Sequence, residues 1–455
     1  MEMVLEFLRD VLSQPALLIG IMSCVGLVAL KRPFHKVMTG TLKPILGYLM
    51  LAAGAGVIVS NLDPLGKMIE HGFHITGVVP NNEAIVAVAQ KVLGVETMSI
   101  LVVGLLMNLC IARFTKFKYV FLTGHHSLFM ACLMSAVLGT AGLSGMELIL
   151  VGGFLMGAWS AISPAIGQSY TSKVTDGDEI ALGHFGSLGY YLSAWVAKYV
   201  GKADDSTEDI EIPEKWGFLR DSTLSTALTM IVFYLIAALA AGSEFVATLS
   251  GSMSPYLFAV MSAMNFAVGV AIVYSGVRMI LGDLIPAFQG IATKIIPNAI
   301  PAVDCAVFFT YAPTAVVLGF ISSFIGGIIG MLILGAVGGV LIIPGLVPHF
   351  FCGATAGIYG NATGGRRGAA VGAFLNGLAI TFLPALALPV LGQLGFQNTT
   401  FGDADFAVMG LVLGHAFEWI GMAGIYGIVA IAALVLIIPN FIKTKGKVIN
   451  YVEEE

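Results

Sequence analysis

Apolar residues occur in long blocks along the chain, and shorter polar segments separate the blocks. Blocks of this kind are typical of helices that cross a lipid bilayer. They allow nine to eleven crossings. The blocks lie at residues 17–30, 46–59, 98–112, 128–143, 148–162, 224–241, 256–274, 299–319, 321–343, 369–391 and 411–438. We therefore predict an all-α polytopic membrane protein with about 11 transmembrane helices.

Two segments interrupt this pattern. Residues 163–189 are rich in Gly and Ser and contain Asp176 and His184, and residues 344–365 are rich in Gly and Asn. Irregular backbone at membrane depth is tolerated only where it is buried in protein or lines a cavity. We interpret both segments as re-entrant hairpins near a substrate. For residues 163–189 the alternative is an ordinary cytoplasmic loop.

The composition supports an integral membrane protein. Hydrophobic residues make up 57% of the 455 positions and charged residues 11%, whereas a soluble domain has roughly 25% charged residues. The mean hydropathy of +0.92 leaves too little polar surface for a soluble protein. The net charge is −5 and no basic tract occurs, which argues against nucleic acid as a partner. The five cysteines lie singly in apolar stretches, so we interpret them as buried apolar residues and expect no metal site.

Basic residues near the ends of the apolar blocks predict the orientation. They follow the first block, the block at 98–112 and the last block, at Lys31, Arg32, Lys36 and Lys43, at Arg113, Lys116 and Lys118, and at Lys443, Lys445 and Lys447. Cytoplasmic loops carry an excess of Lys and Arg. All three groups are therefore expected in the cytoplasm, with the N-terminus outside, the C-terminus cytoplasmic and an odd number of crossings.

Weak similarity between the halves of the chain indicates an internal repeat. Residues 163–187 and 343–365 both place Pro before a segment of small residues and a polar, Gly-containing segment, and residues 40–54 resemble residues 290–305. Such duplication points to a transport site between repeats. The predicted organisation is one integral membrane unit over 1–455, with repeat one at about 13–200, an amphipathic cytoplasmic linker at about 198–222 and repeat two at about 223–442. These patterns leave open whether the repeats are inverted.

Ionisable residues inside apolar blocks are the candidates for function, because each costs about 2.5–3.5 kcal/mol on insertion scales. Asp304 has no basic residue within nine positions on either side. Its carboxylate is suited to accept hydrogen bonds from a polyol. The alternative is a structural pair with Arg278 or Lys294. Glu244 and Glu418 are also isolated, and we interpret them as residues at the interface ends of helices.

Histidines provide the second set of candidates. His125 and His126 follow a helix-breaking Gly124, and His184 lies in the first interrupted segment. Each imidazole can present a donor or an acceptor nitrogen to a ligand. The alternative for His125 and His126 is a position at the membrane boundary. The sequence contains no GxGxxG, Walker A, HExxH or GxSxG motif, so we expect no nucleotide-driven pumping.

Several ordered motifs resemble a known family. They are TGH at 123–125, VTDG and GH between 174 and 184, GVRM at 276–279, IPAVDC at 300–305, YAPTAVVLGF at 311–320 and IIPGLVPHFF at 342–351. Together they resemble the ascorbate-specific membrane (IIC) component of the bacterial phosphotransferase system, over nearly the whole chain.

The resemblance implies a homodimer in the bacterial inner membrane, with eleven-span protomers and inverted repeats. A dimerising scaffold and a substrate-binding core would be interleaved in sequence, and the core would move in an elevator-like manner. The implied substrate is L-ascorbate, phosphorylated on the cytoplasmic side by IIB and IIA partners. Because the phosphoryl-carrying residues lie on those partners, this chain would need no catalytic residue, cofactor or metal of its own.

The resemblance also assigns substrate-binding residues. His125, His184 and Asp304 match the family pattern, and Asn82 and Glu83 align with its Thr-Tyr pair before the third span. The chain departs from the pattern at Phe129 and Phe185, where the family has Gln.

The full set of candidates is His125, His184, Asp304, Asn82, Glu83, His126, Phe129 and Phe185. The predicted function is a permease for L-ascorbate. The alternatives are another sugar acid or polyol in the same family, or a transporter driven by Na⁺ or H⁺ with Asp304 as the ion site.

Overall fold

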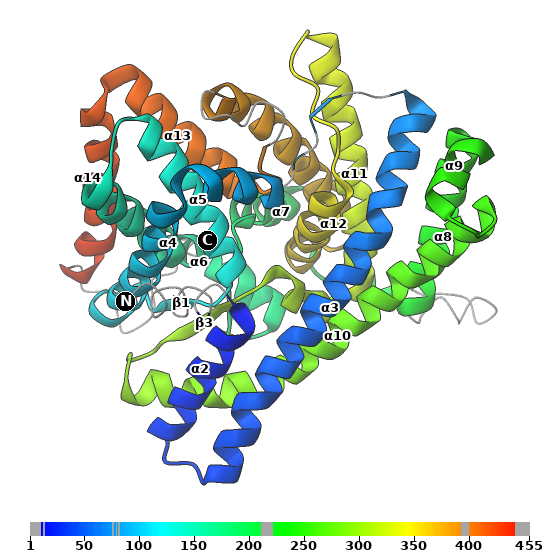
Figure 1. The fold of residues 1–455 in the computed structure, drawn as a ribbon. Helices are drawn as coiled ribbons and strands as arrows, with labels where there is room; N and C mark the ends of the chain where they lie inside the picture. The colour runs from blue at the N-terminus through cyan, green and yellow to red at the C-terminus, as the bar shows by residue number, and fades with distance from the viewer. Residues whose placement is uncertain are drawn as a thin grey trace.

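The chain is mostly helical in a computed structural model that describes residues 11, 14–74, 77, 78, 80, 82–210, 222–392 and 400–441 (Figure 1). The α-helices are α2 (Pro15–Ala29), α3 (Phe34–Phe73), α4 (Asn82–Phe114), α5 (Gly124–Thr140), α6 (Gly145–Thr175), α7 (Ser187–Val200), α8 (Ser222–Ala241), α9 (Ser243–Ser250), α10 (Pro255–Lys294), α11 (Pro313–Ala336), α12 (Leu346–Gly392), α13 (Ala404–Ile420) and α14 (Met422–Phe441). Two short 3₁₀-helices, η1 (Thr207–Asp209) and η3 (Cys305–Thr310), and three strands, β1 (Tyr119–Phe121), β2 (Ala181–Leu182) and β3 (Ile300–Val303), connect them.

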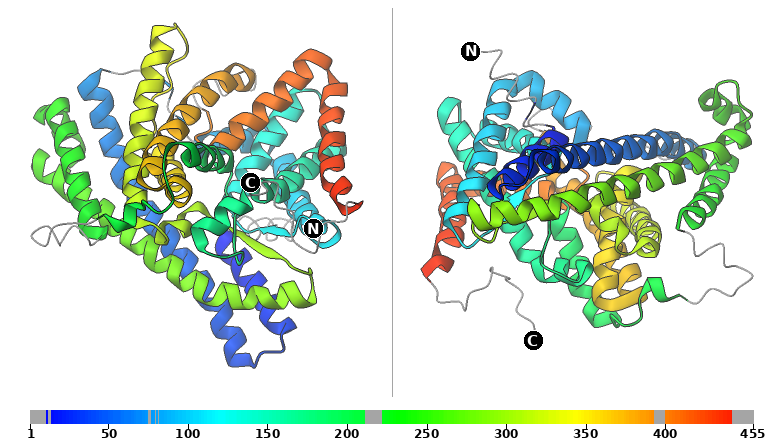
Figure 2. Two further views of the ribbon diagram at one scale, coloured as in Figure 1. Left: turned by 180° about the vertical axis from the view of Figure 1, so that it is seen from behind. Right: turned by 90° about the horizontal axis from the view of Figure 1, so that it is seen from below.

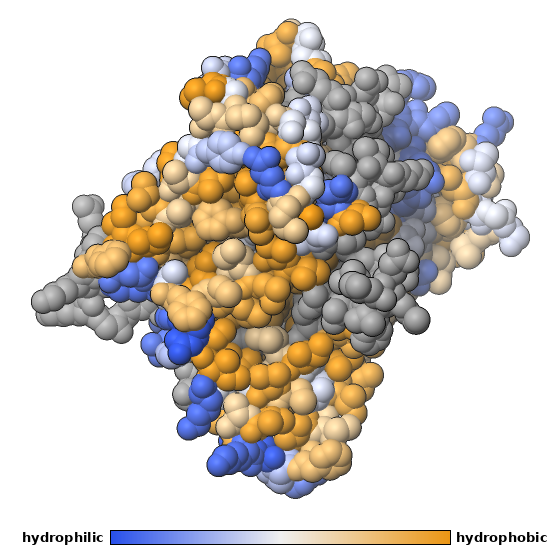
Figure 3. All heavy atoms as spheres, turned by 60° about the vertical axis from the view of Figure 1, so that its left-hand side comes forward, coloured by the Kyte–Doolittle hydropathy of each residue, from blue (hydrophilic) through white to orange (hydrophobic). Residues whose placement is uncertain are grey.

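The prediction of a polytopic helical membrane protein is confirmed. Among the described residues, 7 helices are long and apolar enough to cross a membrane, or up to 8 segments if the bent pair α8–α9 forms one span. Four of the eleven predicted blocks contain no such helix. The blocks at 17–30 and 128–143 form α2 and α5, which have only 15 and 17 residues. The block at 224–241 forms α8 of the bent pair, and the prediction of a span at 299–319 is wrong, because this block contains β3, η3 and only the start of α11. Apolar side chains cover most of the coloured part of the face in Figure 3, as contact with lipid requires.

Two 40-residue helices, α3 and α10, pack side by side over much of their length (Figures 1 and 2). Glycines allow this close approach: a Cβ on Gly54 would lie 2.7 Å from the carbonyl oxygen of Gly269, and one on Gly47 would lie 2.8 Å from that of Gly276. From Gly47 to Gly54 the residue numbers increase along α3, while those of the facing glycines decrease along α10, so the two helices are antiparallel. The apolar block at 46–59 forms the middle of α3, which begins at Phe34 and continues through Pro64 to Phe73.

The first interrupted segment reverses the chain through a strand. α6 continues through Pro164 to Thr175, after which β2 and a short turn lead into α7. The non-helical segment is therefore 176–186 rather than the whole of 163–189.

The second interrupted segment is mainly helix. α12 has non-helical backbone at Gly364 and Gly365, where φ is +59° at Gly365. A Cβ on Gly360 would lie 2.4 Å from the carbonyl oxygen of Gly368, so the two parts of α12 fold back on each other. The one sharply bent helix pair among the described residues is α8–α9, at 117°, which lies in neither interrupted segment.

The described part of the predicted linker caps helix α11. Glu208 accepts hydrogen bonds from the backbone N–H groups of Thr314 (3.1 Å) and Ala315 (3.1 Å) in the first turn of α11. A carboxylate at a helix N-terminus satisfies unpaired N–H groups and interacts favourably with the helix dipole. Residues 211–221 of the linker lie outside the described residues.

The three strands form one small parallel sheet, which the sequence analysis did not predict. Their order is β1-β3-β2. β3 is central: Ile300 pairs with Tyr119 of β1, and Ala302 pairs with Ala181 of β2. All strand residues are buried, and the pairing between the strands provides hydrogen-bond partners for their backbone groups away from lipid. Residues 40–54 lie within α3, whereas residues 290–305 contain the end of α10 and β3, so these two similar segments do not share a conformation.

Candidate functional site

The parallel sheet brings the predicted polar residues together. His125 follows β1 after a short turn, His184 lies two residues after β2, and Asp304 directly follows β3. Because parallel strands end at the same edge of a sheet, their following residues meet there although they are far apart in sequence. His125, His184 and Asp304 all line one cavity.

This cavity is large and mostly apolar. Its volume is about 1080 Å³, slightly above the roughly 300–1,000 Å³ range of small-molecule sites. Besides the residues at the sheet edge, α3 contributes Tyr48, Asp63 and Lys67 to the lining. A concave apolar cavity with a few convergent polar groups is the usual form of a small-molecule binding site.

His125 connects α3 to Asp304. Its Nδ1 lies 3.2 Å from the Tyr48 hydroxyl, and its Nε2 lies 3.4 Å from Oδ2 of Asp304. A carboxylate accepts, so this arrangement favours the tautomer with the proton on Nε2 and with Nδ1 accepting from Tyr48. Asp304 also accepts from the backbone N–H of Ala306 at 3.1 Å. Among the described residues, the side chain that pairs with Asp304 is His125 and not Arg278 or Lys294.

His126 and His184 form a buried, tilted ring pair with centroids 3.8 Å apart. Nδ1 of His126 accepts from the backbone N–H of Phe185 at 3.3 Å. Nδ1 of His184 accepts from the backbone N–H of Gly186 at 3.1 Å and lies 2.9 Å from the Tyr190 hydroxyl. Each neutral ring therefore carries its proton on Nε2, where it is available as a donor.

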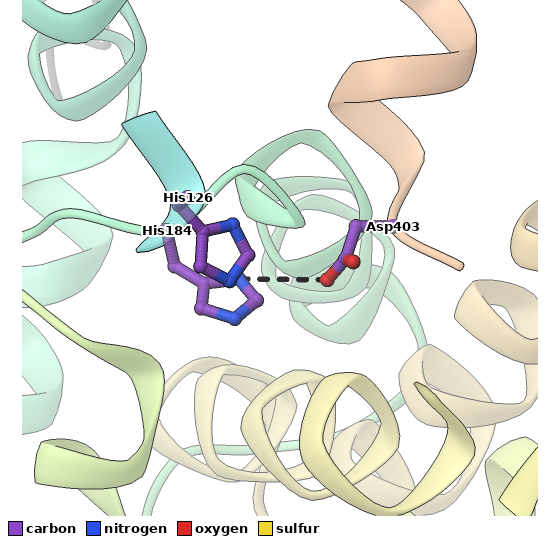
Figure 4. Close-up of side chains that lie close together, drawn as sticks. All are labelled: His126, His184 and Asp403. Carbon is purple, nitrogen blue, oxygen red and sulfur yellow. Dashed lines mark ion pairs between the residues drawn. The ribbon is translucent and has the colours of Figure 1, made fainter. Parts of the chain in front are cut away.

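Asp403 lies beside this histidine pair (Figure 4). Its Oδ1 is 3.8 Å from Nδ1 of His184, which is too long for a hydrogen bond. The side-chain amide of Asn82 donates to Oδ2 of Asp403 at 2.7 Å, and the Cys352 thiol donates to Oδ1 at 3.0 Å. Asp403, Asn82 and Cys352 all line the cavity.

The two phenylalanines that replace glutamines in the family pattern occupy different environments. Phe129 lines the cavity, with its ring centroid 5.8 Å from that of His125. Phe185 is fully buried, stacks on Phe121 at 4.6 Å between centroids and is not among the residues that line the cavity. The side chain of Glu83 lies outside the described residues.

Sequence reasoning did not identify Tyr48, Cys352 and Asp403. Asp403 lies in FGDADF, two residues before Asp405, so it lacks the isolation that distinguishes Asp304 in the sequence. The isolated carboxyls that were considered, Glu244 and Glu418, are exposed and do not line the cavity.

Two groups of side chains at the site have the donor types of a metal centre. The first group is His126, His184 and Asp403. The second group is His184, Asp304 and Cys305. Within each group, the possible ligand atoms lie within 4.8 Å of one another. Nδ1 of His126 and Nδ1 of His184 each accept a backbone hydrogen bond, so Nε2 is the ring nitrogen that each histidine has left for a ligand.

A helical membrane protein with a mostly apolar cavity, into which polar groups converge at a sheet edge, has the form of a membrane transporter. The chain matches the EIIC-GAT family, described as the PTS system sugar-specific permease component, over residues 10–405. This match covers most of the chain, so the protein belongs to this family of phosphotransferase-system sugar permeases.

A curated relative is also similar to the chain. It is the "Ascorbate-specific PTS system EIIC component" of Mycoplasma pneumoniae, which is 27% identical over 417 residues. The matched region covers 78% of this chain and 62% of the relative, so the chain spans less than two thirds of that relative's length.

Proposed function

We propose that the protein translocates L-ascorbate across the bacterial cytoplasmic membrane and that IIA and IIB partners phosphorylate the substrate as it enters. The observation that carries this proposal is the convergence of His125, His184 and Asp304 on one cavity in a member of the sugar-permease family. The similarity to the relative from Mycoplasma pneumoniae supports ascorbate as the substrate.

The geometry suggests a role for each polar group. Asp304 accepts hydrogen bonds from substrate hydroxyls, and the histidines donate from Nε2 to substrate oxygens. Ascorbate is a monoanion at neutral pH, so its enolate is placed away from Asp304 unless that carboxyl is protonated. The phosphoryl-carrying residues are assigned to the partner proteins, so no group of this chain acts as a nucleophile.

We also propose that the chain forms a homodimer with a scaffold and a mobile core. The proposed scaffold is α2, α3, α8, α9 and α10, which pack on one another, and the core contains the sheet and the remaining helices. These two parts are interleaved in sequence. The antiparallel pairing of α3 and α10, which have equal lengths, supports inverted repeats. Elevator-like movement of the core would then carry the site at the sheet edge across the membrane.

The full topology is a proposal of the same kind. It consists of eleven crossings, with the N-terminus outside and the C-terminus in the cytoplasm. The backbone N–H of Lys116 donates to the Asn440 side chain at 2.9 Å, so the basic segment after α4 lies at the same end of the molecule as the end of α14. This contact supports a cytoplasmic location for both the basic segment after α4 and the end of α14.

Another sugar acid or a polyol is the second candidate substrate, and Phe129 is the observation that favours it. An apolar ring beside His125 replaces the amide of the ascorbate pattern, which removes a hydrogen-bonding group from the cavity. Loss of one such group in a buried site is expected to change which hydroxylated ligand binds best.

A thermal-shift screen of the purified protein against L-ascorbate, other sugar acids and hexitols tests the proposed function. We expect L-ascorbate to raise the melting temperature, because a ligand that binds only the folded state stabilises it. We expect Phe129→Gln to bind L-ascorbate about 3- to 10-fold more tightly, since the amide adds a hydrogen bond of about 1 kcal/mol. Phe185→Gln is the matched control and should lower the melting temperature without this gain, because Phe185 is buried outside the cavity. Stabilisation by a hexitol alone would contradict ascorbate as the substrate.

A further inference from the structure

Asp403 has the position of a ligand-binding group that the sequence analysis did not find. It precedes α13 and is 5% exposed, and it lines the same cavity as Asp304. Although it occupies the N-cap position of α13, its side chain makes no capping hydrogen bond to that helix. A buried carboxylate without a capping role needs other partners.

Asn82 holds this carboxylate in place. The Asn82 amide donates to Oδ2 of Asp403 at 2.7 Å, while its Oδ1 accepts from the backbone N–H of Gly402 at 2.9 Å. The Cys352 thiol donates to Oδ1 of Asp403. An ionised carboxylate has about four acceptor positions, so these two contacts leave positions for a ligand in the cavity.

Among the described lining residues of the cavity, no Lys or Arg forms an ion pair with Asp403. The lining contains Lys67, whose amine pairs with Asp63 at 2.8 Å. The contacts that stabilise the Asp403 carboxylate are therefore its hydrogen bonds from Asn82 and Cys352.

Two carboxylates flank one histidine at this site. An oxygen of Asp304 and an oxygen of Asp403 each lie within 4.8 Å of a ring nitrogen of His184. Two neighbouring negative charges repel an anion but accept hydrogen bonds from hydroxyl groups, and charge-assisted hydrogen bonds of this kind are strong. The hydroxyl-bearing part of a sugar or polyol fits this pair of acceptors better than its anionic part does.

We propose that Asp403 is a second substrate-binding carboxylate, which Asn82 positions and which, together with Asp304, binds the uncharged hydroxyl groups of the substrate. This inference rests on the proposed transport function, because it assigns a residue and a recognition chemistry to the same cavity. Any anionic group of the substrate then points away from Asp304 and Asp403.

Binding of L-ascorbate and of sorbitol, an uncharged hexitol, to purified full-length Asp403→Asn tests this assignment by isothermal titration. We expect binding of every ligand that the unchanged protein binds to weaken about 10- to 100-fold, because a charge-assisted hydrogen bond to a hydroxyl is lost. Tighter binding of L-ascorbate, as relief of repulsion would produce, or unchanged affinity would overturn the proposal. If the unchanged protein binds no sugar or polyol, the proposed function itself is wrong.

Two further variants separate binding from folding. Asp405→Asn is the matched control, because Asp405 is fully buried outside the cavity and accepts from Ser187 (2.7 Å), the Leu188 backbone (2.9 Å) and Trp159 (3.2 Å). It should lower the melting temperature but keep the affinity of the folded protein. Asn82→Ala leaves the Asp403 carboxylate intact but removes the hydrogen bond that positions it. The affinity for the ligand should therefore fall about 3- to 10-fold. Should Asp403→Asn fail to fold, unchanged affinity of Asn82→Ala would overturn the proposal.

Discussion

Replacing Asp304 by asparagine is expected to reduce L-ascorbate uptake about 100-fold at limiting substrate. Oδ1 of Asp304 already accepts from Ala306, while Oδ2 faces His125 and the cavity. The amide keeps the size of the side chain but removes the charge, and hydrogen bonds to charged groups contribute about 1.5–3 kcal/mol each. Losing about 3 kcal/mol corresponds to the 100-fold effect. Initial rates of labelled ascorbate uptake measure it.

Asp283→Asn provides the control for this variant. Asp283 lies on α10 and pairs with Lys43 at 3.7 Å near the surface, outside the residues that line the cavity. Partly exposed ion pairs contribute about 0–1 kcal/mol, so uptake by Asp283→Asn should stay within about twofold of the unchanged protein. Full uptake by Asp304→Asn would show that Asp304 does not bind substrate.

Replacing Gly183 by valine is expected to abolish uptake and destabilise the fold by about 3 kcal/mol or more. Gly183 joins β2 to His184, and its backbone N–H donates to the Val303 carbonyl at 2.7 Å. A Cβ there would lie 2.4 Å from the carbonyl oxygen of Ala302. Because that atom belongs to the central strand, either β2 separates from β3 or the backbone shifts, and both outcomes displace His184. Melting temperature and uptake measure the two effects.

Gly177→Val is the comparison for this variant, in the same connection between α6 and α7. A Cβ on Gly177 meets no atom within 4 Å, so this variant should fold and transport normally. If Gly183→Val kept its melting temperature and its uptake, the contact between β2 and β3 could not be what positions His184.

The helices were predictable from sequence because long apolar blocks carry a strong signal, but the sheet was not. β2 has two residues and β3 has four, too few to show the alternation by which strands are recognised. Their pairing also depends on contacts between residues near 119, 181 and 300, which no local pattern encodes. The Gly and Ser content of residues 163–189 also predicted an interrupted segment, although Ser163–Thr175 continues α6.

The candidate site was predictable one residue at a time. Asp304 was distinctive because it is an isolated charge, and His125 and His184 matched motifs of the family. Their common location follows from the parallel sheet, which could not be foreseen. Asp403 was missed because its role becomes visible only through contacts with Asn82 and Cys352, which are distant in sequence. Phe129 and Phe185 looked equivalent in sequence, yet only Phe129 lines the cavity.

Uptake into right-side-out membrane vesicles most directly tests whether this chain is a phosphotransferase-system permease for L-ascorbate. The vesicles contain the protein and are loaded with the soluble phosphocarrier proteins, with or without phosphoenolpyruvate. We predict that labelled ascorbate accumulates as a phosphate ester only when phosphoenolpyruvate is present, and that an uncoupler does not prevent this. Accumulation of unmodified ascorbate without phosphoenolpyruvate, and its collapse on addition of an uncoupler, would contradict the account and identify an ion-coupled transporter instead.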